Sequence, residues 1–578
     1  MSYLDVPRLH FFGQFLANPG TLNNILANYD PHNPARPLWN PRGVALFQLQ
    51  GKNVNGTQMS GVTVTSVQDA SGNLVTSPSQ DPLVGAAVQS GSGSPAKIVD
   101  LDPWQQLISQ LFGLQLQVVI GGTGSGAGFS MKAGQYAPVP SLTDLWFVRS
   151  PQGGPSGIYQ TVLLPDQIQW NDPGASPLLQ QFQQACQDGI SVKFTVDLYD
   201  MSNASPTFTL GRIAGAFGPA RPGEPIRFPV RKLVPQVAEG GNPQDVNFWP
   251  APLAVDETRS KAVLDLANSF QIQVNPKTGV EEAVSVGTAT AVILAESGPI
   301  PLTPDLDYSQ EQYEITAGIV EVDLTPDQLS AIGENPVGIV TQSTGSAPVL
   351  AEAAPYVNLS QTFLRLSPGD TAEVQLYAFK YGKPLADQTL AVELIQPGFF
   401  EQNFPQYPGL DQSIQAGSSQ PASGITLGDG SGAVTTDASG VATLQITANA
   451  PTPLPAARQF IDSQIYFLGG PWQGSAYFWW PMSLAPLSVV IYDEFNIPQS
   501  PTWTRDVQPV LAQYMRLYPG MKQILDMSSY DVVQQNAQAL QQVFSADITD
   551  PNRMPVTRDL APAKMQMVLN WIAAGLPR

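Results

Sequence analysis

The sequence predicts a mainly β, multidomain protein made of antiparallel β-sandwich or barrel units, with a small helical bundle at its C-terminal end. Three observations lead to this fold class. Gly and Pro number 50 and 54 in 578 residues, and charged residues make up only 13%, a composition typical of short strands joined by long loops. Residues 192–198 alternate strictly between apolar and polar side chains. Helical periodicity is concentrated after residue 504.

The central stretch is Ile190–Pro235. Its first part has a period of two, which is typical of a strand with one buried face. Residues 201–206 supply turn chemistry, and the apolar run 208–218 follows, so we expect a hairpin. A third strand is expected at 226–230. This unit contains no obvious reactive group.

Residues 1–350 are predicted to form one β-rich domain around this stretch. Further strands are expected at 4–12, 44–49, 62–67, 97–102, 114–120, 262–267, 272–274, 289–295 and 319–324. Helical segments are expected at 104–112, as one or two turns, at 177–186, and at 325–332, where Thr325, Pro326 and Asp327 suit a helix start.

Residues 351–500 are predicted to form a second β-domain, with a different sequence pattern. Residues 361–394 predict three strands, and 432–447 predicts a hairpin with Asp437 and Gly440 at its bend. Strands at 464–468 and 487–492 follow. This region resembles a bacterial immunoglobulin-like sandwich, in which a hairpin of the form TD-x-x-G-x-A recurs. The last region, 501–578, is predicted to be helical at 506–518, 529–544 and 561–574.

Composition also bounds function. A formal net charge of -20 argues against binding nucleic acid or an anionic membrane as a main task. The single cysteine, Cys186, permits no intrachain disulfide. No basic and apolar leader opens the sequence, and no stretch is long enough to span a bilayer. We therefore expect a cytoplasmic protein with no membrane span, and leave non-classical export open.

Few residues suit catalysis. The only histidines are His10 and His32, so any imidazole chemistry depends on one of them. His10 lies among apolar residues in RLHFF, which favours a hydrogen-bonded strand residue over a general base. The catalytic candidates are His10, Arg8, Asp100 and Asp102. For the two aspartates, on one face of a strand, a solvated edge is the simpler interpretation.

No cofactor or metal is expected, although haem and iron are left open. The His and Cys clusters that zinc needs are absent from the sequence. Residues 121–128, GGTGSGAG, follow a predicted strand but lead into no helix, so we interpret them as a loop rather than a dinucleotide cradle.

An aromatic cluster lies in the segment GGPWQGSAYFWWP. It comprises Trp472, Tyr477, Phe478, Trp479 and Trp480. It suits either an internal seam beside the helical end or a partner-binding patch, and we favour the seam because most large aromatic side chains are buried.

The opening residues resemble the start of the iminophenyl-pyruvate dimer synthases, also called chromopyrrolate synthases, of violacein and rebeccamycin biosynthesis. The shared pattern is Leu4, Asp5, Pro7, Arg8, His10, Phe11 and Gly13. Colinear segments follow at 81–86, 97–103, 198–202, 518–521 and 550–564, so the resemblance extends over nearly the whole chain. Those synthases continue into a ferritin-like half rich in Glu and His, which this sequence does not contain, so their oxidative reaction is not carried over.

The helical end also resembles, faintly, the frame of a c-type cytochrome domain, through residues 503–509, 554–555 and 571–575. The Cys-x-x-Cys-His motif that attaches haem is absent there. This resemblance implies helices whose haem space is filled by side chains.

Three functions remain in view. The first is a non-catalytic scaffold or binding subunit that acts with a separate protein partner, such as a ferritin-like or oxidase protein. The second is an oxidative enzyme of amino-acid-derived secondary metabolism that uses its β-domains. The third is a surface or self-assembling structural protein.

Overall fold

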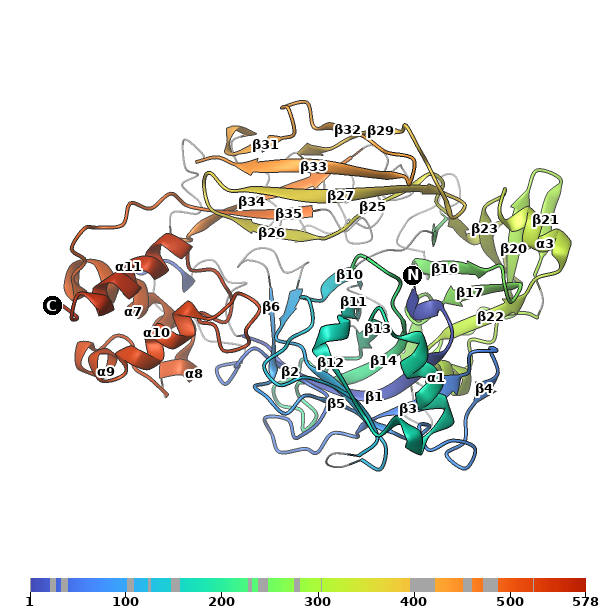
Figure 1. Cartoon of the computed structure of the whole chain (residues 1–578), viewed down its shortest axis with the longest axis horizontal. Coiled ribbons are helices and arrows are strands. Elements are labelled where there is room, and N and C mark those ends of the chain that lie inside the picture. The colour runs from blue at the N-terminus through green and yellow to red at the C-terminus, as the bar shows by residue number, and fades with distance from the viewer. Residues whose placement is uncertain are drawn as a thin grey trace.

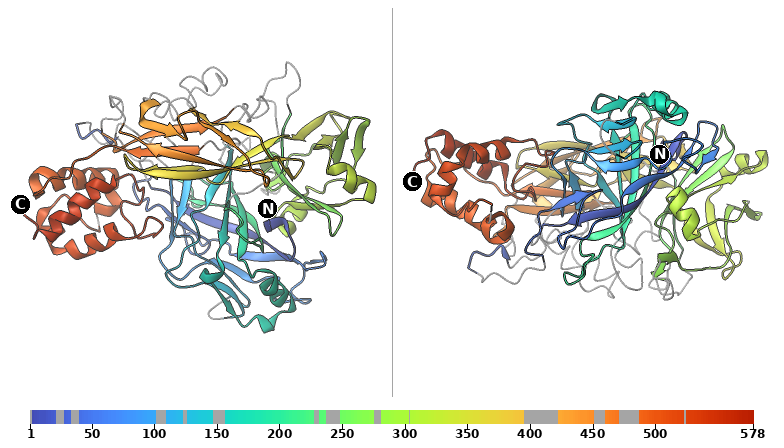
Figure 2. Two further views of the ribbon diagram at one scale, coloured as in Figure 1. Left: turned by 45° about the horizontal axis from the view of Figure 1, so that its top comes forward. Right: turned by 90° about the horizontal axis from the view of Figure 1, so that it is seen from below.

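The structure is a computed structural model. It describes residues 2–20, 28–32, 40–100, 109–122, 126–146, 156–226, 231–236, 248–274, 281–302, 304–394, 422–450, 460–470, 487–522 and 524–578. It is mainly β, with several antiparallel sheets and a small C-terminal helical region, as predicted. Four units are visible: two large sheets, a sandwich and a group of helices (Figure 1). The second sheet and the helices lie at opposite ends of the molecule (Figure 2).

The first unit is a 14-stranded sheet. Its strands are β1 (Arg8–Asn18), β2 (Leu46–Gln48), β3 (Val62–Gln68), β4 (Leu74–Val75), β5 (Ala87–Ser90), β6 (Ala96–Asp100), β7 (Ser109–Phe112), β8 (Leu116–Val119), β9 (Gly128–Met131), β10 (Ser141–Trp146), β11 (Ser156–Leu163), β12 (Ile168–Asn171), β13 (Ile190–Asp197) and β14 (Leu210–Pro219). Helix α1 (Pro177–Ala185) precedes β13. The helical turns expected at 104–112 are wrong for residues 109–112, which form strand β7 between β6 and β10.

Strand β1 forks. One edge pairs with β14 along its length, whereas the other pairs with β3 over residues 8–12 and with β2 over residues 16–18. The order β1-β14-β13-β11-β10-β7-β6-β2 therefore returns to β1 and closes a ring. Gly13 lies at the fork, where a Cβ would come within 2.6 Å of the Gly61 carbonyl oxygen. Only glycine fits so close an approach of two backbones.

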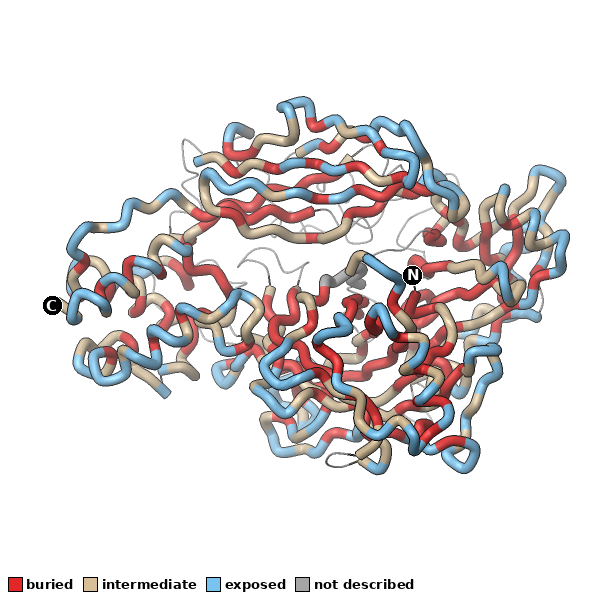
Figure 3. Tube along the Cα trace, in the orientation of Figure 1, coloured by how far each residue is buried: buried red, intermediate tan, exposed pale blue. Residues whose placement is uncertain are grey.

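The predicted hairpin at the centre is confirmed, since β13 and β14 pair in antiparallel register from Ile190 with Pro219 to Asp197 with Arg212. The expectation of one buried face is wrong: β13 is buried on both faces, including Lys193, Thr195 and Asp197. Figure 3 shows buried residues running continuously through these strands. The polar face is buried because the second unit covers it.

The second unit is an eight-stranded sheet with its own core. Its strands are β15 (Lys232–Pro235), β16 (Ala251–Asp256), β17 (Lys261–Asp265), β20 (Ala289–Ala295), β21 (Gly298–Pro301), β22 (Ile319–Asp323), β23 (Val337–Thr341) and β24 (Pro348–Glu352). A two-stranded sheet of β18 (Ile272–Val274) and β19 (Glu281–Ala283), and helices α2 (Gln310–Thr316) and α3 (Pro326–Ile332), complete it. Most of the strand expected at 226–230 lies outside the described residues; β15 follows it and pairs with β16 and β24, away from β14.

The third unit is a sandwich of a five-stranded and a four-stranded sheet around one core, to which a separate two-stranded sheet also contributes. Its strands are β25 (Tyr356–Leu359), β26 (Phe363–Leu366), β27 (Thr371–Lys380), β28 (Lys383–Pro384), β29 (Thr389–Ala391), β30 (Glu393–Leu394), β31 (Ile425–Leu427), β32 (Ala433–Thr435), β33 (Val441–Ala448), β34 (Ser463–Gly469) and β35 (Leu487–Tyr492). The predicted bend is present, because the Asp437 carboxylate accepts from Ser439 and Val441 amides and Gly440 has a φ of 75°. The hairpin pairing is wrong: β32 pairs with β29, and β33 pairs with β27 and β31.

The helical unit contains α7 (Gln508–Leu517), α8 (Pro519–Lys522), α9 (Tyr530–Gln535), α10 (Ala537–Ser545) and α11 (Pro562–Ala573). It has its own core around the fully buried Trp571. Within the described ranges, no helix is long and apolar enough to cross a membrane.

Phe112 of β7 joins three of these units. The guanidinium of Arg558, from the helical unit, lies 4.1 Å from the centre of its ring, and that of Arg365, from the sandwich, lies 5.8 Å away. Tyr492 of the sandwich donates a 2.7 Å hydrogen bond to the carbonyl oxygen of Arg558. A cation is attracted to the electron-rich face of an aromatic ring, so these contacts and the hydrogen bond link the three units.

Candidate functional site

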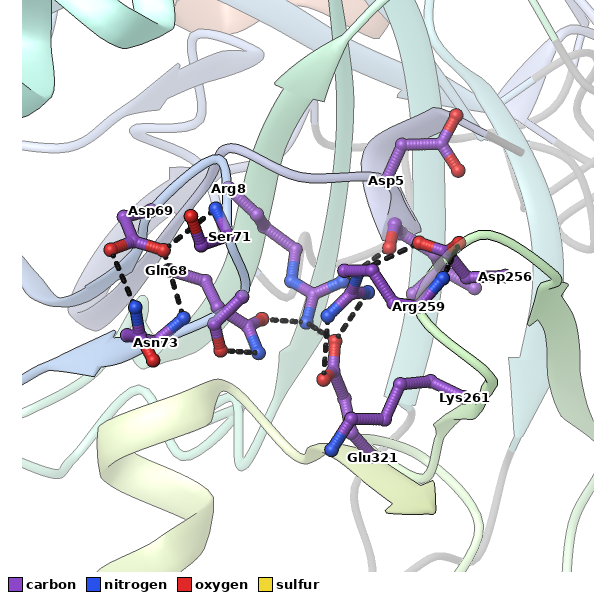
Figure 4. Close-up of polar contacts among 12 residues, drawn as sticks. Asp5, Arg8, Gln68, Asp69, Ser71, Asn73, Asp256, Arg259, Lys261 and Glu321 are labelled. Atoms are coloured by element: carbon purple, nitrogen blue, oxygen red, sulfur yellow. Dashed lines mark hydrogen bonds and ion pairs between the residues drawn. The ribbon is translucent and has the colours of Figure 1, made fainter. Parts of the chain in front are cut away.

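The sequence-predicted residues Arg8 and His10 lie at the interface between the first and second units. Along β1, Leu9 and Phe11 point into the core of the first unit, so Arg8 and His10 point the other way. There they meet β22 and the end of α2, together with Ser66 and Gln68 of β3. We call the set Arg8, His10, Ser66, Gln68, Asp256, Arg259 and Glu321 the interunit network; Figure 4 shows most of it.

Arg8 is 1% exposed, and every nitrogen of its guanidinium has a partner. Its Nε donates to Nε2 of His10 at 2.9 Å. Nη1 donates to the carbonyl oxygen of Leu4, and Nη2 donates to Gln68 and, at 3.0 Å, to Glu321. A planar fork of five donors is suited to this kind of convergence. Arg8 therefore ties the N-terminal turn, β3 and the second unit together.

The contacts of His10 fix its tautomer. Because Nε2 accepts from Arg8, the ring proton belongs on Nδ1, which donates to Oγ of Ser66 at 2.8 Å. Ser66 in turn donates to the carbonyl oxygen of Ile315 in α2 at 2.7 Å. Burial, and next the charge of Arg8, lowers the pKa of His10 well below its usual value. The imidazole is thus neutral, with both nitrogens engaged.

Glu321 balances two guanidiniums. It accepts from Arg8 at 3.0 Å and from both terminal nitrogens of Arg259 at 3.0 Å. Arg259 also donates to Asp256 at 2.7 Å, so two positive and two negative charges meet. Burial alone would raise the pKa of Glu321, but its bonds to Arg259 and the charges of both arginines outweigh that effect and lower it.

Two more buried ion pairs lie on the same polar face. Lys193 of β13 lies 2.8 Å from the carboxylate of Asp265 in the second unit, which also accepts from Tyr3 at 2.7 Å. Arg212 of β14 donates twice to Asp197 of β13, both at 2.8 Å. The isolated charge of any one of these groups would be costly at such depth, which is why each is paired.

This arrangement limits the chemistry. A general base or nucleophile needs a free atom within reach of a substrate, and those of Arg8 and His10 are engaged internally. The network can hold two units together and set their orientation. The sequence pattern Leu-Asp-x-Pro-Arg-x-His indicates the first strand of this network. Glu321, Arg259 and Asp265 are distant from that strand in sequence and were not predicted. The only sequence signal for a second buried surface was the row of polar side chains on β13, which the prediction of one buried face left exposed to solvent.

Of the other predicted catalytic and partner-binding residues, the structure describes only Asp100. Asp100 is half-buried on β6, opposite Ser109 of β7. Asp102 lies outside the described residues, as does the aromatic cluster Trp472, Tyr477, Phe478, Trp479 and Trp480. His32 is exposed. Cys186 is buried, and burial raises the pKa of its thiol.

The helical unit contains a small apolar pocket. Its lining includes Met515, Met521, Met527 and Met554, with Tyr514 and Tyr518. Within the described parts of the chain, no group of three or more His, Cys, Asp or Glu side chains is placed to hold a metal ion.

Comparisons with known proteins give no family. No protein-family model matches the chain, and no curated protein matches it. Among solved structures, domains 4 and 5 of the S-layer protein SbsC share 12% identity over 46% of this chain and 98% of that chain, with a TM-score of 0.14. The alpha-2-macroglobulin of E. coli shares 10% identity over 86% of this chain and 32% of that chain, with a TM-score of 0.15. TM-scores this low support no inference about fold or function.

Proposed function

We propose that this chain is a non-catalytic scaffold or binding subunit, which acts with a separate protein partner or with further copies of itself. The observation that supports the proposal most is the interunit network. The residues best suited by type to catalysis, Arg8 and His10, are 1% exposed and bonded between units. Their role there is to fix the arrangement of the units.

A second set of contacts supports the same function. It joins Phe112, Arg365, Tyr492 and Arg558, and we call it the Phe112 junction. A chain that holds its β-units and its helices together through buried contacts presents a large surface of constant shape. Such a surface suits the docking of a partner, because little conformational freedom is lost on binding. The resemblance of residues 4–13 to the dimer synthases suggests which partner to try first: a separately encoded ferritin-like or oxidase protein.

The test has two parts. The purified chain is examined by absorption spectroscopy and metal analysis, and its mass is measured by sedimentation velocity over a wide concentration range. It is then mixed with the product of any neighbouring ferritin-like gene. We expect a colourless, metal-free protein that forms a complex of defined stoichiometry. A Soret band or stoichiometric iron in the chain alone, or a lone monomer in every mixture, contradicts the proposal.

A further inference from the structure

A short segment of the first unit packs into the helical unit. Residues 28–32, which we call the docking segment, belong to the connection between β1 and β2. Tyr29 is nevertheless 2% exposed and forms part of the core of the helical unit. In addition, Nη2 of Arg516 in α7 donates to the carbonyl oxygen of Asn28. The docking segment therefore attaches the helical unit to the first unit.

The docking segment bonds to a buried carboxyl group, that of Asp559. The hydroxyl of Tyr29 donates to Oδ2 of Asp559 at 3.1 Å, and the hydroxyl of Thr557 donates to Oδ1 at 2.5 Å. Tyr514 of α7 and Tyr518, the residue after that helix, lie near the same group. Burial, and next the charge of Asp559, raises the pKa of both tyrosines. Side chains from three parts of the chain thus surround one carboxyl group.

Among the described residues, no lysine or arginine forms an ion pair with Asp559. The nearby Nζ of Lys564 pairs with Asp462 instead. The guanidinium of Arg558 lies over the ring of Phe112 and donates to three backbone carbonyl oxygens. A carboxylate that is buried without a cation is costly, whereas the protonated carboxyl group carries no charge. This environment therefore favours the protonated form.

The direction of the pH effect follows from this environment. Burial raises the pKa of Asp559 above its ordinary value of 3.8, and the hydrogen bonds from Thr557 and Tyr29 offset this only in part. The contribution of Asp559 to stability is therefore complete below pH 3.8 and is lost as the pH rises through the folded pKa. The titratable groups that face Asp559 from the surrounding elements are Tyr29, Asp462, Tyr492, Tyr514, Tyr518 and Lys564.

We propose that Asp559 makes the attachment of the helical unit to the docking segment sensitive to pH. The contact is closed while the carboxyl group is protonated. Once the group ionises, it carries a buried charge without a cation, and opening of the contact lets water reach that charge. The helical unit thus loosens from the docking segment as the pH rises. This switch goes beyond the scaffold role and does not depend on it, because it is measured within a single chain.

Hydrogen exchange of the full-length chain, followed by mass spectrometry, tests the proposal, because it reports the opening of α7 and α11 separately from that of the β-units. Protection, corrected for the intrinsic exchange rate, is compared between the unmodified chain and Asp559→Asn from pH 4 to pH 7.5. The amide cannot ionise. We therefore expect the ratio of unmodified to variant protection in these helices to fall by up to tenfold per pH unit and then to level off. A ratio that does not change with pH overturns the proposal.

Two further variants complete the test. Tyr29→Phe removes a hydrogen bond that lowers the pKa of Asp559, so the fall in protection should continue to a higher pH than in the unmodified chain. This variant keeps Asp559, so it decides the matter even if Asp559→Asn does not fold; an unchanged profile overturns the proposal. Asp531→Asn is the control, because Asp531 of α9 is exposed and paired with Arg578. A pH effect of that control as large as the effect of Asp559→Asn also overturns the proposal.

Discussion

Nε of Arg8 donates to Nε2 of His10 at 2.9 Å, so the arginine assigns the tautomer of the histidine two residues away. That assignment directs Nδ1–H to Ser66 and, through Ser66, to the backbone of α2. A charge brought onto the imidazole would break this chain of bonds at its first link. The stability of the interface between the first and second units therefore depends on a neutral His10.

The first prediction concerns pH. Because the pKa of His10 is lowered in the folded chain, the unfolded chain binds an extra proton below the ordinary value of 6.5. His10 therefore leaves the free energy of unfolding unchanged above that pH. Below it, His10 lowers the free energy of unfolding by up to roughly 1.4 kcal/mol for each pH unit. Urea unfolding between pH 7 and pH 5 should lose this slope in His10→Gln and keep it in His32→Gln. An unchanged slope in His10→Gln contradicts the tautomer chain.

A second prediction concerns Glu321. Its pKa is lowered in the folded chain, so its contribution is present above its ordinary value of 4.5 and is lost as the pH falls through the folded pKa. Glu321→Gln leaves Arg8 and Arg259 facing each other and should cost about 3 kcal/mol at pH 7.

Strand β22 offers a matched control for that variant. Asp323 is 74% exposed and forms a 2.6 Å pair with Lys261, so Asp323→Asn should cost less than about 1 kcal/mol. Chemical denaturation at pH 7 compares the two. Equal losses contradict the assignment of Glu321 to a buried network.

The third prediction concerns the Lys193–Asp265 pair. Either Lys193→Met or Asp265→Leu leaves an unpaired buried charge and should cost about 3–5 kcal/mol. The double variant removes both charges, so its loss should be much smaller than the sum of the two single losses. Urea denaturation of all four proteins gives the coupling energy. Additive losses would mean that the pair does not interact.

A fourth prediction concerns the Phe112 junction. Tyr492→Phe deletes the hydroxyl that donates to Arg558 and should cost about 1 kcal/mol. It should also speed proteolytic release of the helical unit. Tyr377→Phe is the comparison, because the hydroxyl of Tyr377 bonds to Gln375 within the same strand. Equal cleavage rates in the two variants contradict the role of this junction.

The sequence predicted the β13–β14 hairpin well because its signal is local: alternation and a turn lie within 30 residues. It could not predict that the polar face of β13 is also buried. Lys193 and its partner Asp265 are 72 residues apart, and no pattern in either segment indicates the other. A paired charge and a solvated charge look alike in a sequence.

The candidate site shows the same limit. The pattern around Arg8 and His10 drew attention to residues that do converge, but their partner Glu321 is 313 residues from Arg8. The hairpin at 432–447 failed for a related reason: its turn is real, yet each strand finds a better-matched neighbour elsewhere. Turn chemistry fixes a bend, and the competition between strands fixes the pairing.

The forked strand β1 also bears on synthesis. Leu9 pairs with Phe217, so the first strand made must wait for the ribosome to add more than 200 residues before its longest neighbour exists. At typical elongation rates the wait is roughly 10–40 s. Throughout it, a nascent chain exposes an apolar strand that has only β2 and β3 to pair with. The strand that closes the finished ring thus needs protection from aggregation during translation.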